Sequence, residues 1–129
     1  MEKELKKYTI LVVEDENSLN KALIDKFSHS GFSTLQAKNG QEGFEMATQK
    51  HPDLILLDIV MPRMDGITML KKLRQDEWGK KVEVIMLTNL NEVEKISEAV
   101  SQGSYDYLVK TDWKLDAVVE KVKEKLKIK

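Results

Sequence analysis

The sequence lacks cysteine and contains only two prolines among its 129 residues. The absence of cysteine excludes disulfide bonds, thiolate metal sites and cysteine nucleophiles. No apolar run approaches the roughly 18 residues that cross a membrane, and residues 1–7 are charged rather than signal-like. We therefore expect an unsecreted, cytoplasmic protein with no membrane partner, in which residues 1–7 form a flexible tail.

An excess of charge of either sign is also missing. Charged residues make up 33% of the chain but sum to a formal net charge of −1 at pH 7. Proteins that bind nucleic acid through its phosphates depend on a basic surplus, so we expect no direct nucleic-acid partner. The length suits one domain, residues 1–129, that buries roughly two thirds of the surface exposed by the unfolded chain.

Short apolar runs alternate with stretches of helical periodicity from Tyr8 onward. This alternation is typical of a parallel α/β domain. It predicts five strands, at Tyr8–Val13, Ser33–Ala37, Asp53–Leu57, Val82–Leu87 and Tyr105–Val109. Right-handed crossovers on both faces of such a sheet produce a doubly wound fold, whose ligand crevice lies at the carboxyl ends of the strands.

Polar residues of complementary chemistry follow the predicted strands. Glu14 and Asp15 follow the first strand, and Asp58 follows the third. Thr88 follows the fourth strand, and Lys110 follows the fifth. Because parallel strands bring their carboxyl ends to one edge of the sheet, we expect these side chains to form one polar cluster.

The predicted cluster suits phosphoryl chemistry. Three carboxylates in one crevice repel one another and favour a hard divalent cation with oxygen ligands, for which Mg²⁺ is the natural candidate. A carboxylate beside bound magnesium, that of Asp58, can attack phosphorus and form an acyl phosphate. Lys110 would neutralise the transferring phosphoryl group, and Thr88 would donate a hydrogen bond to it after transfer.

Four motifs in this order resemble the receiver domain of bacterial response regulators, over about Tyr8 to Leu126. They are Val13–Glu16, Leu57–Gly66, Thr88 and Tyr107–Lys110. The resemblance implies a flavodoxin-like (βα)5 fold, with a five-stranded parallel sheet in the order 2-1-3-4-5 and helices on both faces. It also implies a phosphorylation-dependent switch of a two-component system, and not an enzyme that acts on external substrates.

The resemblance implies a role for each matched residue. Asp58 would accept a phosphoryl group from a sensor histidine kinase or phosphotransfer protein. Asp15 would bind magnesium directly, Glu14 would act mainly through metal-bound water, and the backbone carbonyl of Val60 would be a further ligand. Lys110 would pair first with Asp58 and then with the phosphoryl group.

The resemblance also implies a switch made of Thr88 and Tyr107. On phosphorylation the threonine would move toward the phosphoryl group and the aromatic ring would turn inward behind it. This would alter the surface of the helix after the fourth strand, the fifth strand and the last helix. A downstream protein, or an output domain outside this sequence, would read that surface.

Two positions depart from the family pattern. Thr111 follows Lys110 where the family usually has proline, and Asn89 follows Thr88 where the family favours a small residue. A non-proline cis bond costs about 2.5–4 kcal/mol, so the bond before Thr111 is either trans with a rearranged loop or strained. We hypothesise that Asn89, with Val60 and Leu90, affects the lifetime of the phosphoryl group.

Three other functions stay open at this level. The two departures fit a receiver-like interaction module that works without phosphate. A phosphatase of the haloacid dehalogenase type would need an aspartate two residues beyond Asp58, where Val60 stands. A flavodoxin would need a phosphate-cradling loop after the first strand, where residues 14–16 are acidic and would repel it. A stand-alone receiver and the amino-terminal piece of a longer regulator are both compatible with the sequence.

Overall fold

A computed structural model describes residues 7–88, 106–109 and 114–128, and within 106–109 it describes the side chain of Leu108 only. The elements in chain order are β1 (Thr9–Val13), α2 (Asn17–His29), β2 (Ser33–Ala37), α3 (Gly40–Lys50), β3 (Leu54–Asp58), α4 (Gly66–Gln75), β4 (Glu83–Thr88), β5 (Asp106–Val109) and α6 (Leu115–Lys125). The expected alternation of strands and helices is thus confirmed. Strand boundaries differ from the prediction by at most one residue, and Asp58 and Thr88 end their strands instead of following them.

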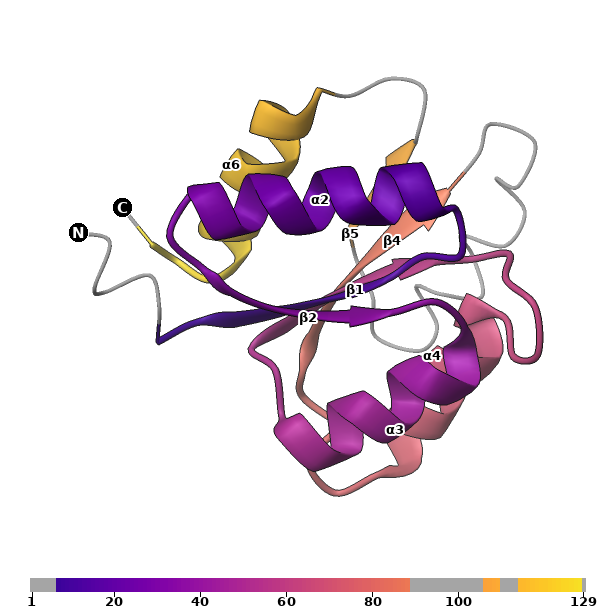
Figure 1. Ribbon diagram of the computed structural model, residues 1–129. Coiled ribbons are helices and arrows are strands. Elements are labelled where there is room, and N and C mark those ends of the chain that lie inside the picture. The colour runs from indigo at the N-terminus through magenta and orange to yellow at the C-terminus, as the bar shows by residue number, and fades with distance from the viewer. Residues whose placement is uncertain (1–6, 89–105, 110–113, 129) are drawn as a thin grey trace.

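The strands form one parallel sheet in the order β2-β1-β3-β4-β5. Helices α2 and α6 cover one face, and α3 and α4 cover the other (Figure 1). The doubly wound arrangement predicted from the sequence is therefore confirmed. The complete set of five strand–helix units stays a prediction, because the helix expected between β4 and β5 falls within residues 89–105, outside the described residues. The expected tail, residues 1–7, also lies outside them except for Lys7.

Alternation along the central strands divides the core into two halves. Leu11 and Ile55 point to the half under α3 and α4, whereas Ile10 and Leu54 point to the half under α2 and α6. All four side chains are fully buried. A strand buried on both faces reads as a continuous apolar run, which is why these strands were recognisable in the sequence.

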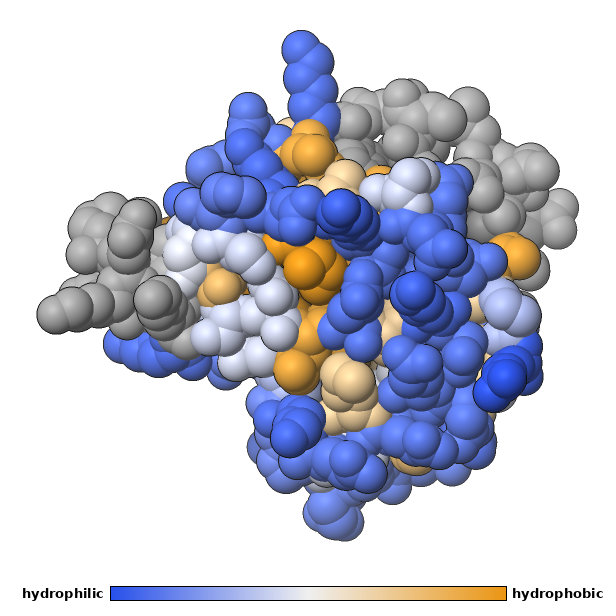
Figure 2. All heavy atoms as spheres, viewed as in Figure 1, coloured by the Kyte–Doolittle hydropathy of each residue, from blue (hydrophilic) through white to orange (hydrophobic). Residues whose placement is uncertain are grey.

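Polar residues cover most of the surface in Figure 2, and apolar residues gather in a strip between α2 and α3, where the edge strand β2 lies. β2 lies at an edge of the sheet, and it has the smallest share of apolar residues among the five strands. Among the described residues, none of the helices is both long and apolar enough to cross a bilayer.

The two helices on the α3–α4 face begin at polar caps. The Asn39 side chain accepts a hydrogen bond from Glu42 N at 2.8 Å, and the Asp65 side chain accepts one from Thr68 N at 2.8 Å. Such caps satisfy backbone amides that have no partner within the helix. They determine where α3 and α4 begin, which is at the same edge of the sheet as the carboxyl ends of the strands.

Candidate functional site

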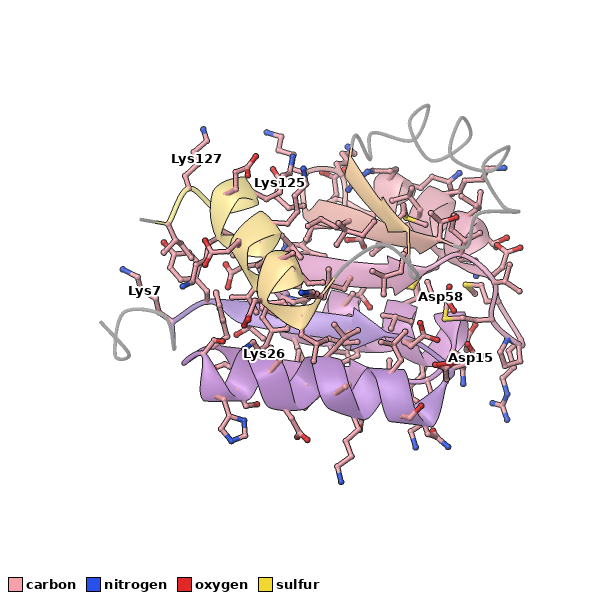
Figure 3. The ribbon with its side chains drawn as sticks, turned by 90° about the horizontal axis from the view of Figure 1, so that it is seen from above. Lys7, Asp15, Lys26, Asp58, Lys125 and Lys127 are labelled. Atoms are coloured by element: carbon pink, nitrogen blue, oxygen red, sulfur yellow. The ribbon has the colours of Figure 1, made fainter. Side chains whose placement is uncertain are left out.

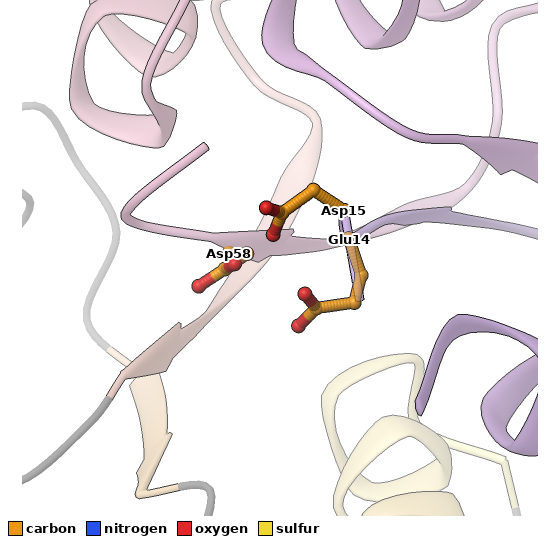
Figure 4. Close-up of side chains that lie close together, drawn as sticks. All are labelled: Glu14, Asp15 and Asp58. Carbon is orange, nitrogen blue, oxygen red and sulfur yellow. The ribbon is translucent and has the colours of Figure 1, made fainter. Parts of the chain in front are cut away.

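Three acidic residues meet at the carboxyl edge of the sheet, and we call them the acid cluster: Glu14, Asp15 and Asp58. One carboxylate oxygen from each lies within 4.8 Å of the other two. Glu14 is fully buried, Asp58 is 2% exposed and Asp15 is exposed. Figure 4 shows the three side chains projecting from the ends of β1 and β3.

Strand register explains why the acid cluster forms. Val13 in β1 lies opposite Leu57 in β3, so the residues that follow them, Glu14 and Asp58, are neighbours across the two strands. In Figure 3, Asp15 and Asp58 lie at one end of the sheet, while Lys7 and Lys127 lie at the other. The predicted meeting of acids from two distant segments is therefore found in the structure.

The fourth strand brings a buried hydroxyl group to the same edge, where the fifth strand also ends. Thr88 is fully buried at the end of β4, and the residue before it, Leu87, pairs with Asp58. Thr88 itself pairs with Val109, the residue before Lys110. Lys110 lies outside the described residues. Tyr107 pairs with Met86 through its backbone, and its side chain is outside the description.

The loop after β3 lies close to the acid cluster. Val60, two residues beyond Asp58, is 47% exposed. Gly66 N donates a hydrogen bond to Ile59 O at 2.7 Å, which draws the start of α4 against the end of β3. A β-carbon at position 66 would overlap the carbonyl oxygen of Asp58. Gly66 belongs to one of the four motifs, but nothing in the sequence pattern indicates the close approach that requires a glycine there.

A buried amide lies behind the acid cluster and was missed by the sequence analysis. Asn20 in α2 is fully buried, and its Nδ2 donates to Glu14 O at 2.7 Å and to Ala37 O at 3.0 Å. Its position, three residues before Leu23 and seven before Phe27, places it on the buried side of the helix. The available signal for a buried role was a polar residue at a position where the helical repeat places apolar side chains.

The donor set of the acid cluster fits a hard divalent cation. Carboxylate oxygens from Glu14, Asp15 and Asp58 are close enough to serve one ion, and magnesium prefers such ligands. Magnesium sites typically use one or two carboxylates and keep several waters, which leaves positions for phosphate oxygens. The exposure of Asp15 leaves the site open to solvent on one side.

A doubly wound parallel sheet with an acid cluster at its carboxyl edge defines a class of α/β domains that bind ligands at this edge. Within that class, a family model described as the response regulator receiver domain matches residues 10–123. The chain belongs to this family. The resemblance inferred from the four motifs is confirmed.

Individual relatives agree with this assignment. The chain is 32% identical over 120 residues to sporulation initiation phosphotransferase F of Bacillus subtilis (strain 168), covering 93% of this chain and 94% of that protein. It is 41% identical over 101 residues to regulatory protein AtoC of Escherichia coli (strain K12), covering 78% of this chain. The match spans only 22% of AtoC.

A solved structure shares the fold. The receiver domain of sensor histidine kinase PA1611 from Pseudomonas aeruginosa PAO1 superposes with a TM-score of 0.82 at 24% identity, covering 91% of this chain and 95% of that one. That domain has a magnesium ion coordinated in its active site cleft. The family acts in phosphorylation-dependent signalling by two-component systems, and its receiver domains are not enzymes on external substrates.

Proposed function

We propose that this chain is a signalling switch that accepts a phosphoryl group on Asp58 in a magnesium-dependent reaction. The observation that carries the proposal is the acid cluster, in which oxygens of three carboxylates lie within 4.8 Å of one another. Two of these carboxylates are buried, and burial of like charges is costly unless a cation or another partner offsets it. The proposal covers the whole chain, residues 1–129, as one receiver domain.

Asp15, Asp58 and the backbone carbonyl of Val60 would hold Mg²⁺, and Glu14 would act mainly through metal-bound water. Magnesium, when bound, neutralises negative charge on the phosphoryl oxygens. An oxygen of Asp58 forms the new bond to phosphorus while the bond from phosphorus to the donor nitrogen of a kinase histidine breaks. That nitrogen keeps the electron pair, so the transfer is balanced.

Residues on β4 and β5, together with the residue that follows β5, would stabilise the phosphorylated state and signal it to a partner. The Thr88 hydroxyl donates a hydrogen bond to the attached phosphoryl group, and Lys110 supplies a neighbouring positive charge. Thr88 and Tyr107 act as the switch. Their rearrangement alters the surface formed by the helix expected after β4, by β5 and by α6.

Two kinds of partner follow from this function. A sensor histidine kinase or phosphotransfer protein in the cytoplasm supplies the phosphoryl group. A downstream protein, or an output domain outside this sequence, reads the altered surface. The family relationship supports both, since response regulators receive phosphoryl groups from kinases and act on outputs.

Intact-protein mass after incubation with acetyl phosphate tests the proposal. We expect the wild type to gain one phosphoryl group with magnesium and none without it, and Asp58→Asn to gain none. Asp53→Asn is the matched control, because Asp53 lies just before the same strand at its opposite end and accepts a hydrogen bond from Thr9 N at 2.7 Å. This control should be labelled like the wild type.

The result that would overturn the proposal is a folded wild type that gains no phosphoryl group. A folded Asp58→Asn variant that is labelled as efficiently as the wild type would also overturn it. An interaction module that works without phosphate would then be the better reading, tested by partner binding of Asp58→Asn.

A further inference from the structure

Asn20 is a polar side chain on the buried side of α2. It is fully buried, as are Leu23 and Phe27 on the same side of the helix. A buried amide group lowers stability unless each of its polar atoms finds a hydrogen-bond partner. The partners of Asn20 therefore show what the residue does at this position.

Both donors and the acceptor of the Asn20 amide are used. Nδ2 donates to Glu14 O at 2.7 Å and to Ala37 O at 3.0 Å, and Oδ1 accepts from Gln36 Nε2 at 2.6 Å. Two of the three partners are backbone carbonyls, which only accept, so the orientation of the amide is determined. The side chain thus joins the ends of β1 and β2.

The hydrogen bonds of Asn20 lie at the carboxyl ends of these strands. Val13 and Ala37 are the final register pair, and Glu14 N donates to Ala37 O at 3.1 Å. The Ala37 carbonyl therefore receives two hydrogen bonds, one from the Glu14 backbone and one from Asn20. Asn20 extends the connection between β1 and β2 to the residue that begins the acid cluster.

The carbonyl of Glu14 belongs to the peptide group that links the Cα atoms of Glu14 and Asp15. Because a peptide group is planar, a hydrogen bond that holds this carbonyl also restricts both Cα atoms. Two of the three carboxylates in the acid cluster are carried by those Cα atoms. The orientation of one peptide plane thus affects the direction of two candidate metal ligands.

We infer that Asn20 is a positioning residue for the acid cluster, which holds the Glu14–Asp15 peptide so that both carboxylates face Asp58. The inference rests on the proposed function for its metal-binding consequence. Magnesium requires near-ideal octahedral geometry, so ligands on a rotating peptide bind it less tightly. Groups that orient metal ligands typically change metal affinity by about 10–100-fold when removed.

Magnesium titration of Asn20→Ala by calorimetry tests the inference. We expect a dissociation constant about tenfold above that of the wild type. Labelling by acetyl phosphate should slow at limiting magnesium and approach the wild-type rate at saturating magnesium. A general structural defect would not produce this dependence, because more metal would not restore the rate.

Asn39→Ala is the matched control. Asn39 is also an asparagine at the carboxyl edge of the sheet and also bonds to backbone, accepting from Glu42 N at 2.8 Å, but no hydrogen bond among the described residues joins it to the Glu14–Asp15 peptide. We expect it to lose stability and keep the wild-type magnesium affinity. Equal magnesium affinity in folded Asn20→Ala and wild type would overturn the inference.

A measurement on the wild type keeps the inference testable if Asn20→Ala does not fold. In ¹⁵N spectra, the side-chain amide protons of Asn20 should exchange with water much more slowly than those of the exposed Asn17. They should also shift on addition of magnesium, with the same midpoint as the backbone amide of Asp15. Exchange as fast as that of Asn17, or no shift during a titration that moves the Asp15 amide, would overturn the inference.

Failure of the proposed function can be distinguished from failure of this inference. If the folded wild type neither binds magnesium nor gains a phosphoryl group, the proposed function fails. The rate at which the Glu14 backbone amide proton exchanges with solvent then tests whether Asn20 positions this segment. Faster exchange in Asn20→Ala than in both the wild type and Asn39→Ala supports it, and unchanged exchange overturns it.

Discussion

Gly66 and Asp58 approach so closely that a β-carbon on residue 66 would overlap the carbonyl oxygen of Asp58. The Gly66 amide also donates to Ile59 O at 2.7 Å, so the first residue of α4 is held against the end of β3. A substitution at position 66 therefore displaces the backbone that carries the proposed phosphoacceptor.

We expect Gly66→Ala to lower the free energy of unfolding by about 3 kcal/mol, because backbone atoms, unlike a flexible side chain, cannot move aside cheaply. Urea unfolding measures this change. The control is Thr68→Ala, an exposed position in the same helix, which should change stability by less than about 0.5 kcal/mol. Equal stability of Gly66→Ala and wild type would show that this contact relaxes without cost.

Arg63 lies in the loop after β3 with φ 68°, a left-handed conformation that glycine adopts more readily. We expect Arg63→Gly to raise the free energy of unfolding by about 0.5–1 kcal/mol, because relief of strain exceeds the added flexibility of the unfolded chain. A shift of the urea unfolding midpoint, with an unchanged dependence of the free energy on urea concentration, measures this change. The control is Lys38→Gly, at an exposed site without positive φ, which should lower the free energy of unfolding. If both variants were less stable than the wild type, the strain argument would be contradicted.

The acid cluster should destabilise the metal-free protein. Two unit charges within 4.8 Å of each other repel by at least about 3.5 kcal/mol at an effective dielectric constant of about 20. Asp58 makes other contacts that offset part of this gain, so we expect Asp58→Asn to raise stability by about 1 kcal/mol without magnesium. Magnesium should stabilise the wild type and have little effect on the variant.

Urea unfolding with and without magnesium chloride measures both effects. Asp53→Asn is the control, because it removes a carboxylate of the same kind outside the acid cluster. It should lose a little stability and keep the magnesium response. A metal-free Asp58→Asn variant less stable than the wild type would mean that the contacts of Asp58 outweigh the repulsion.

Asp116 in α6 forms an ion pair with Lys26 in α2, and the hydrogen bond and charge of Lys26 lower the pKa of Asp116 from its usual 3.8. A lowered folded-state pKa contributes stability that is present above pH 3.8 and is lost as pH falls through the folded value. Asp116→Asn should therefore be slightly less stable than the wild type at pH 7, and the difference should disappear in acid.

The expected difference is small because the Asp116 side chain is 84% exposed, and it should shrink at high salt. Urea unfolding of both proteins from pH 7 to about pH 3, with and without about 1 M sodium chloride, measures it. A difference that grows in acid would contradict the sign of the pKa shift.

Much of the fold followed from local patterns. The runs Ile10–Val13 and Leu54–Leu57 identify central strands, because a strand covered on both faces needs apolar residues at every position. The acids after those runs pointed to one edge of the sheet. Glu14 and Asp58 could be placed together before the structure was known, since parallel strands in one sheet end on the same side.

The sequence by itself thus determined the strands, the edge at which the site lies and the identity of the acid cluster, because hydrophobic periodicity is a local property of the chain. Tertiary structure decided the roles of Asn20 and Gly66. Asn20 bonds to Ala37, 17 residues away, and Gly66 is required by the carbonyl of Asp58. Periodicity can place Asn20 on the buried side of its helix. It cannot identify the partners of either residue, because those partners lie on segments that meet only after folding.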